Sequence, residues 1–103
     1  MAVAELFRAL GDSNRLEMVK RLSSGKRYTI NTLFQGMDIT RQGARKHLQI
    51  LVDSDLVKLQ SQGRDTQVLL NKKKLEDGRT FIAELEQEWD SRLEALRGVI
   101  ESE

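Results

Sequence analysis

The residues best suited to chemistry are five polar side chains that follow Thr40 at helical spacing. They are Arg41, Gln42, Arg45, Lys46 and Gln49. Residues four apart lie above one another on a helix, so these side chains form two neighbouring rows. All five can donate hydrogen bonds, and none is acidic. An ordinary solvated helix face mixes both signs of charge, so this composition favours a polyanionic partner.

The chemistry of these side chains matches the major groove of double-stranded DNA. Arginine can hold guanine through two hydrogen bonds, glutamine can pair with adenine, and lysine can neutralise a phosphate. Thr40, as N-cap, adds a helix N-terminus suited to a phosphate oxygen. On the other side, Ala44, Leu48 and Leu51 form an apolar stripe that predicts a helix ending near Ser54. We therefore predict a helix that packs on one side and recognises DNA with the other.

Catalytic and metal chemistry find little support in the sequence. The chain has no cysteine and one histidine, His47, which borders the apolar stripe. A nucleophile needs an oriented base, and a metal needs a cluster of ligands. We expect no enzyme, no cofactor and no metal site, and interpret His47 as a packing and hydrogen-bonding residue. A role of His47 in sensing pH or phosphate is the less favoured alternative. Gly43, inside the predicted helix, is explained equally by close backbone approach or by a tolerant position.

Two helices are expected ahead of this segment. Val3, Leu6, Phe7 and Leu10 share one helix face, and Gly11 ends that helix. Asp12 or Ser13 can cap a second helix, which residues 23–25 terminate. Its apolar side is assigned to Leu16, Val19 and Leu22.

A short third helix and a tight turn connect these helices to the polar one. Thr29 is the expected cap, with Ile30, Leu33 and Phe34 facing inward. Residues 36–38 form the turn, in which Asp38 is expected to take the left-handed conformation.

After residue 54 the hydrophobic period changes. Residues 56–60 and 67–71 are β-leaning and flank turn residues 61–66, which predicts a hairpin with Arg64 near its tip. We assign Arg64 to a minor groove or flanking phosphate, with a solvated charge as the alternative. A long helix then runs from Lys72 or Leu75 to Ile100. The order α-α-α-α-β-β-α, mainly helical with one small hairpin, predicts a winged helix-turn-helix fold.

Length and charge agree with one DNA-binding domain over residues 1–103. Residues 1–74 carry 14 Lys and Arg against 7 Asp and Glu, a net charge of +7. Residues 75–103 carry 3 against 9, a net charge of −6, so the last helix should face away from DNA. There is no cysteine, signal pattern or long apolar run, and we expect a cytoplasmic protein without membrane contact.

Three segments together resemble the ArsR (SmtB-like) family of small bacterial winged-helix repressors. They are LFRALGDSNRLEMVKRL, ITRQGARKHLQILVDSDLV and the wing GRDTQV, and the resemblance covers essentially the whole chain. The run from Lys46 to Leu51 followed by Asp55-Leu56-Val57 is similar to the family's recognition helix entering the wing.

The resemblance implies a homodimeric repressor whose recognition helices enter successive major grooves of an inverted-repeat operator. It also implies that the first and last helices form the dimer contact. On this basis we assign eight interface residues: Val3, Leu6, Phe7, Ile82, Leu85, Trp89, Leu93 and Leu96. An intramolecular core is the alternative for this stripe, and the stripe can serve both purposes.

The chain departs from the family pattern at several positions. It lacks the cysteines and the last-helix histidine through which many members sense metals. Asp38 stands where glycine is usual in the turn, and Phe34 where a small residue is favoured. The sequence does not indicate which small molecule or protein, if any, acts as an inducer. The competing hypothesis is a winged-helix protein-interaction module that does not bind DNA, for which apolar or acidic residues would be expected on the polar face.

Overall fold

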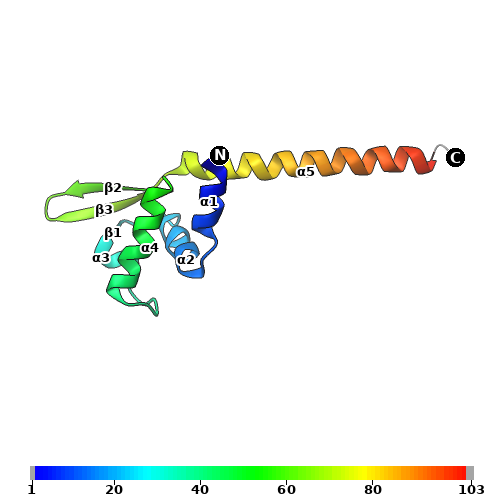
Figure 1. The fold of residues 1–103 in the computed structure, drawn as a ribbon. Coiled ribbons are helices and arrows are strands. Elements are labelled where there is room, and N and C mark those ends of the chain that lie inside the picture. Colours follow the sequence, from blue (N-terminus) through cyan, green and yellow to red (C-terminus); the bar gives the residue numbers. More distant parts are fainter. Residues whose placement is uncertain (1, 102–103) are drawn as a thin grey trace.

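The computed structural model describes residues 2–101, which form a small helical body with two projections (Figure 1). The elements in order are α1 (Ala2–Leu10), α2 (Ser13–Leu22), β1 (Tyr28–Thr29), α3 (Ile30–Leu33), α4 (Arg41–Asp53), β2 (Val57–Gln62), β3 (Asp65–Leu70) and α5 (Lys72–Glu101). The wing β2–β3 and the end of α5 project in opposite directions, and the molecule measures 71 × 25 × 25 Å. The predicted mainly helical fold with a hairpin is confirmed.

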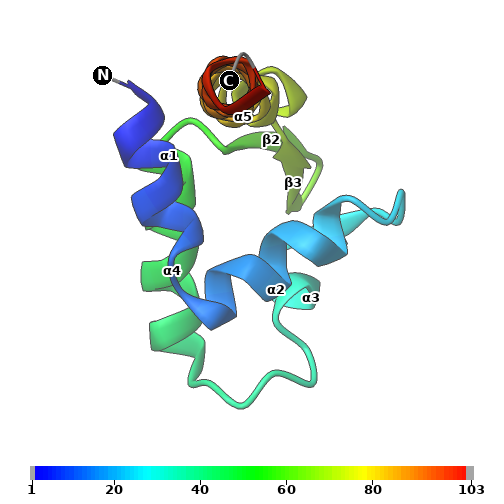
Figure 2. The ribbon, with the colours of Figure 1, turned by 90° about the vertical axis from the view of Figure 1, so that its right-hand side faces the viewer.

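The core lies where α1, α2, α3, α4 and the base of the sheet meet. Its fully buried large side chains are Leu6, Met18, Leu33, Leu51, Leu56 and Val57. Seen along α5, the rest of the body lies on one side of that helix (Figure 2). The first turns of α5 therefore cover the body, and its remaining length extends beyond it. Among the described residues, no helix has the length and apolar character that crossing a membrane requires.

The sheet contains a strand that the sequence did not predict. Tyr28 pairs with Val68 and Thr29 with Gln67, so β1 adds an antiparallel edge to β3 and the strand order is β1-β3-β2. Two residues are too short to show an alternating pattern, so only the tertiary pairing defines this strand. Its effect is to anchor the start of α3 on the wing.

The hairpin is longer and its turn tighter than predicted. β2 and β3 pair from Val57–Leu70 to Gln62–Asp65, leaving Gly63 and Arg64 as the turn. Gly63 has φ 59° and is the turn's only described residue with positive φ. This is the pattern of a type II′ turn, in which the first central position favours glycine. The polar residues expected in a loop are instead strand residues of an exposed wing.

Two local expectations were wrong. Asp38 does not have positive φ, because Gly36 takes that conformation in the turn (φ 78°). An aspartate does adopt it at Asp55 (φ 64°), where α4 ends and the chain turns into β2. Leu16, assigned to the apolar side of α2, is 50% exposed, and Met18 is the residue of that helix buried in the core.

Candidate nucleic-acid interface

Helix α4 has the cap and the two faces that the sequence predicts. The Thr40 hydroxyl accepts a hydrogen bond from the Gly43 amide at 2.9 Å, which begins the helix. Ala44, Leu48 and Leu51 are buried against the core. A Cβ on Gly43 would lie 3.1 Å from the Thr40 hydroxyl oxygen, so glycine leaves room for the cap. This contact explains a residue for which the sequence left two alternatives open.

The five polar residues of α4 are all exposed: Arg41, Gln42, Arg45, Lys46 and Gln49. The Gln49 amide donates to the Asp53 carboxylate at 2.8 Å, so part of its hydrogen-bonding capacity is used within the helix. The other four make no side-chain hydrogen bond or ion pair within residues 2–101. Four donor side chains are therefore free on one helix face.

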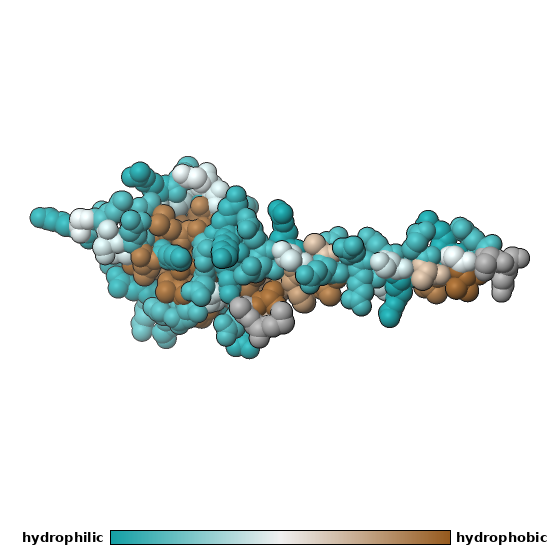
Figure 3. All heavy atoms as spheres, turned by 90° about the horizontal axis from the view of Figure 1, so that it is seen from above, coloured by the Kyte–Doolittle hydropathy of each residue, from teal (hydrophilic) through white to brown (hydrophobic). Residues whose placement is uncertain are grey.

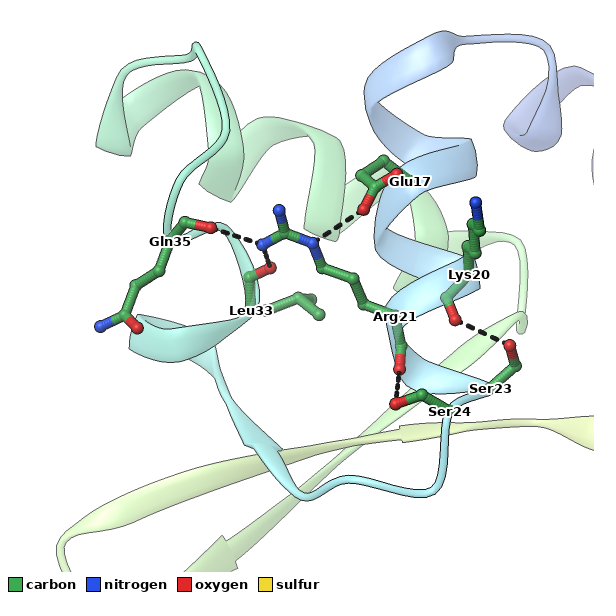
Figure 4. A network of polar contacts seen from close by, with 7 residues as sticks. All are labelled: Glu17, Lys20, Arg21, Ser23, Ser24, Leu33 and Gln35. Atoms are coloured by element: carbon green, nitrogen blue, oxygen red, sulfur yellow. Dashed lines mark hydrogen bonds and ion pairs between the residues drawn. The ribbon is translucent and has the colours of Figure 1, made fainter.

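Arg21 fixes the short helix and turn that lead into α4 (Figure 4). Its Nη1 donates to the backbone carbonyls of Leu33 at 3.0 Å and Gln35 at 2.6 Å, and its Nε donates to Glu17 at 2.9 Å. These carbonyls lie at the C-terminal end of α3, where helix carbonyls lack intrahelical partners. Arg21 thus holds α2 to the end of α3. The sequence analysis missed this role, because a carbonyl contact twelve residues away leaves no local signal.

The start of α3 is fixed by reciprocal hydrogen bonds. The Thr29 hydroxyl accepts from the Thr32 amide at 3.3 Å, and the Thr32 hydroxyl accepts from the Thr29 amide at 2.9 Å. This capping box confirms Thr29 as the cap. Side-chain hydrogen bonds therefore hold both ends of α3.

The wing presents Arg64 at its tip. Arg64 is exposed in the two-residue turn, and β2 and β3 carry the tip away from the body (Figure 1). Because α4 is connected to β2 by residues 54–56 alone, the wing and the polar face of α4 belong to one continuous segment. Asn71 strengthens this junction by donating to the Asp55 carbonyl at 2.8 Å.

Comparisons with known proteins agree with this architecture. A family model described as a helix-turn-helix domain matches residues 10–60. An uncharacterized HTH-type transcriptional regulator of Bacillus subtilis, YuzN, is 32% identical over 78 residues, which is 70% of this chain and 85% of YuzN. A solved ArsR-like transcriptional regulator from Rhodococcus sp. RHA1 is 26% identical, with a TM-score of 0.83 over 95% of this chain and 92% of its own.

The chain belongs to the ArsR family of winged helix-turn-helix transcriptional regulators. A second solved structure, 22% identical with a TM-score of 0.63, supports the fold alone. It is a homodimeric winged helix-turn-helix DNA-binding domain from Mycobacterium bovis, and it covers 90% of this chain and 82% of its own.

The residues assigned to a dimer contact in this ArsR-family chain fall into two groups. Those on α5 are exposed: Ile82, Leu85, Trp89, Leu93 and Leu96, at 44–57% of their surface. They follow one side of the projecting helix, and Val99 and Ile100 continue the stripe (Figure 3). The five assigned side chains are therefore exposed to solvent in the single chain.

The assigned residues on α1 mainly serve the protomer itself. Leu6 is 1% exposed, so its inclusion in an interface was wrong. The reason is Gly78, whose absent side chain lets α5 approach α1: a Cβ there would lie 2.6 Å from Leu6 Cδ2. Phe7 packs against Phe81 with ring centroids 5.8 Å apart, and Val3 is half-buried beside the core. Only the outer sides of Phe7 and Val3 are available to a partner.

His47 lies at the edge of the packed face and is hydrogen-bonded. Its Nδ1 is 3.0 Å from Arg15 Nη1 and 3.8 Å from the Asp12 carboxylate. This confirms its interpretation as a packing and hydrogen-bonding residue. The Asp12 carboxylate also accepts from the amides of Asn14 and Arg15, and the Arg15 amide is the main cause that lowers the pKa of Asp12 below its usual value. Among residues 2–101, no cluster of three His, Cys, Asp or Glu residues is arranged to hold a metal ion.

Proposed function

We propose that this protein binds double-stranded DNA sequence-specifically, with α4 in the major groove. The observation that carries the proposal is a set of four exposed α4 side chains that have no hydrogen-bond or ion-pair partner among residues 2–101: Arg41, Gln42, Arg45 and Lys46. Arg45 and Gln42 are assigned to base edges, which bidentate arginine and amide contacts distinguish. Lys46 and Arg41 are assigned to phosphates or neighbouring bases.

Three further residues contribute at the margins of this surface. Thr40, at the N-terminus of α4, and Arg64, at the wing tip, are assigned to phosphate or minor-groove contacts. Gln49 is assigned a weaker contribution, because its amide is hydrogen-bonded to the acidic side chain of Asp53.

The protein acts on DNA as a homodimer in this proposal. The apolar stripe of α5 would be costly to leave in water, and a second copy of the same helix can cover it. Charge favours an antiparallel arrangement of the two helices. Residues 82–90 carry four acidic and no basic residues, whereas residues 91–101 carry two of each. A parallel pair would place the acidic halves against each other, and an antiparallel pair avoids this repulsion.

The stripe also has the symmetry that an antiparallel pair requires. The positions of its residues are nearly symmetric about residue 91. In an antiparallel pair, Ile82 would therefore face Ile100 of the partner subunit, and Trp89 would lie beside the partner's Leu93. The partner's helix end would then return toward the outer sides of Phe7 and Val3. The similar Mycobacterium bovis domain is itself homodimeric.

A symmetric dimer presents two copies of α4 to an inverted-repeat operator, with half-sites about one helical turn apart. We propose that the protein represses transcription in the bacterial cytoplasm by occupying such an operator.

The test begins with duplexes selected from a randomised pool by the purified protein. Affinity for the selected duplex should fall steeply as salt rises, because phosphate contacts release counterions. Arg45→Ala should weaken binding to that duplex by about 5- to 150-fold, the effect of losing one bidentate base contact. Arg45→Lys is the matched control, since it retains the charge but not the planar fork. It should keep binding to random duplex and lose preference for the selected one.

Two outcomes would contradict the proposal. If both Arg45 variants lost the same affinity for selected and for random DNA, Arg45 would contact only phosphate. Failure to bind any duplex at low salt would favour a protein-interaction module.

A further inference from the structure

Arg15 joins three helices at the back of the DNA-binding unit. From α2, its Nε donates to the Ala9 carbonyl at 2.6 Å and its Nη2 to the Arg8 carbonyl at 3.4 Å, both at the C-terminal end of α1. Its Nη1 lies 3.0 Å from Nδ1 of His47, which is on α4. One guanidinium therefore links α1, which packs on α5, to the helix proposed to recognise DNA.

This contact defines the protonation state of His47. A guanidinium has only donors and stays charged at any pH that a folded protein meets. Nδ1 of His47 must then accept the hydrogen bond, which requires a neutral imidazole with its proton on Nε2. The ring nitrogen that faces Arg15 cannot carry a hydrogen while the contact exists.

Protonation of His47 would reverse this interaction. Nδ1 would become a donor facing another donor, and two positive charges would lie about one hydrogen-bond length apart. The charged groups in direct contact with the imidazole are Arg15 and Asp12, both at the start of α2. Glu5 and Arg8 of α1 and Asp53 of α4 line the hollow beside Arg15. Within α4, the positions three and four residues away are Gly43, Ala44, Ile50 and Leu51, none of which titrates.

Asp12 is the carboxylate nearest to His47, and it is already hydrogen-bonded. Its Oδ1, 3.8 Å from His47 Nδ1, accepts hydrogen bonds from the amides of Asn14 and Arg15 as the cap of α2. Bringing that oxygen to a protonated His47 would loosen the cap or move α4. The first change loosens the start of α2, where Arg15 holds His47, and the second displaces α4 directly.

We propose that neutral His47, held by Arg15, is a positioning residue for the recognition helix, and that protonating His47 lowers affinity for the operator. His47 is 22% exposed, so protons can reach it from solvent. The assay therefore runs from pH 8 to pH 5.5, the range in which histidine is the side chain generally able to change charge. This inference depends on the DNA-binding function proposed above.

The test compares the wild-type protein with His47→Asn. The Asn Oδ1 is the same number of bonds from Cα as His Nδ1 and can accept from Arg15 at every pH. Affinity for the selected duplex is measured by fluorescence anisotropy at constant ionic strength between pH 8 and pH 5.5. We expect wild-type affinity to fall by about tenfold over this range, which corresponds to about 1.4 kcal/mol of binding free energy. His47→Asn should match the wild type at pH 8 and change much less.

An Arg15→Met variant provides a second check, because without the guanidinium the protonation of His47 should no longer weaken binding. Unfolding curves at both pH values establish that every variant is folded. Parallel pH profiles for the wild type and His47→Asn would overturn the inference, as would an NMR tautomer assignment that places the proton on Nδ1 at pH 8. If the wild type fails to select a duplex at pH 8, the proposed function fails instead, so the two failures are distinguishable.

Discussion

Replacing Gly78 with alanine tests how closely α5 must approach α1. An added Cβ would lie 2.6 Å from Leu6 Cδ2 and 3.7 Å from Phe7 Cζ. Leu6 is 1% exposed, so its side chain cannot swing into solvent to relieve the clash. Overpacking of this kind costs about 1–3 kcal/mol. Alanine returns about 1 kcal/mol through its higher helix propensity, so the net loss should be up to about 2 kcal/mol.

The same helix supplies a matched control. Gly98 has no heavy atom within 4 Å of the position that its Cβ would occupy. Gly98→Ala should therefore gain up to about 1 kcal/mol from helix propensity alone. The difference between the two variants, about 1–3 kcal/mol, isolates the packing cost because the propensity gain is common to both.

Urea unfolding at one fixed protein concentration measures both variants, since the stability of a dimer depends on concentration. In a double-mutant cycle, Gly78→Ala should cost much less stability when Leu6 is also alanine, because the shortened side chain makes room for the added Cβ. The coupling free energy between the two substitutions should therefore account for most of the packing cost. Equal stabilisation by Gly78→Ala and Gly98→Ala would refute the close approach of α1 and α5.

Further variants probe the recognition helix, the elements that hold it and the proposed dimer contact. Asp12→Asn should retain the α2 cap while removing part of the acid sensitivity. The pKa of Asp12 is lower in the folded state, chiefly because its carboxylate accepts from the Arg15 amide. Its contribution to folding stability is therefore present above about pH 4 and is lost as the pH falls through the folded pKa. If the Asn variant lost stability in acid as steeply as the wild type does, this reasoning would be contradicted. Arg21→Met should cost about 1.5–3 kcal/mol in urea unfolding and weaken DNA binding, because two carbonyls at the end of α3 lose a charged donor; unchanged values in both assays would remove Arg21 from this role. Thr40→Ala should lose about 1 kcal/mol and Thr40→Ser very little; equal losses would mean that the hydroxyl is not the cap. Replacing both Leu85 and Trp89 with glutamate should yield monomers with poor operator affinity, and an unchanged sedimentation profile would reject α5 as the interface.

Much of this protein is determined by local sequence. The helix from Arg41 to Asp53 could be predicted because its cap, its apolar stripe and its polar face follow a period set by backbone geometry. Thr29 as a cap and the position of the hairpin were predictable for the same reason. The exposure of the four donor side chains also follows from the pattern, since the opposite face must be buried.

Other features were decided by contacts between residues distant in sequence. The burial of Leu6, the edge strand β1, and the carbonyl contacts of Arg21 depend on which elements meet, and no local period encodes that. Gly78 illustrates the difference. In the sequence it is a helix-weakening residue without explanation, whereas in the structure it is the point at which α1 lies against α5. Periodicity specifies which side of a helix is buried, but the partner that buries it, and how closely it approaches, are set only when the chain has packed.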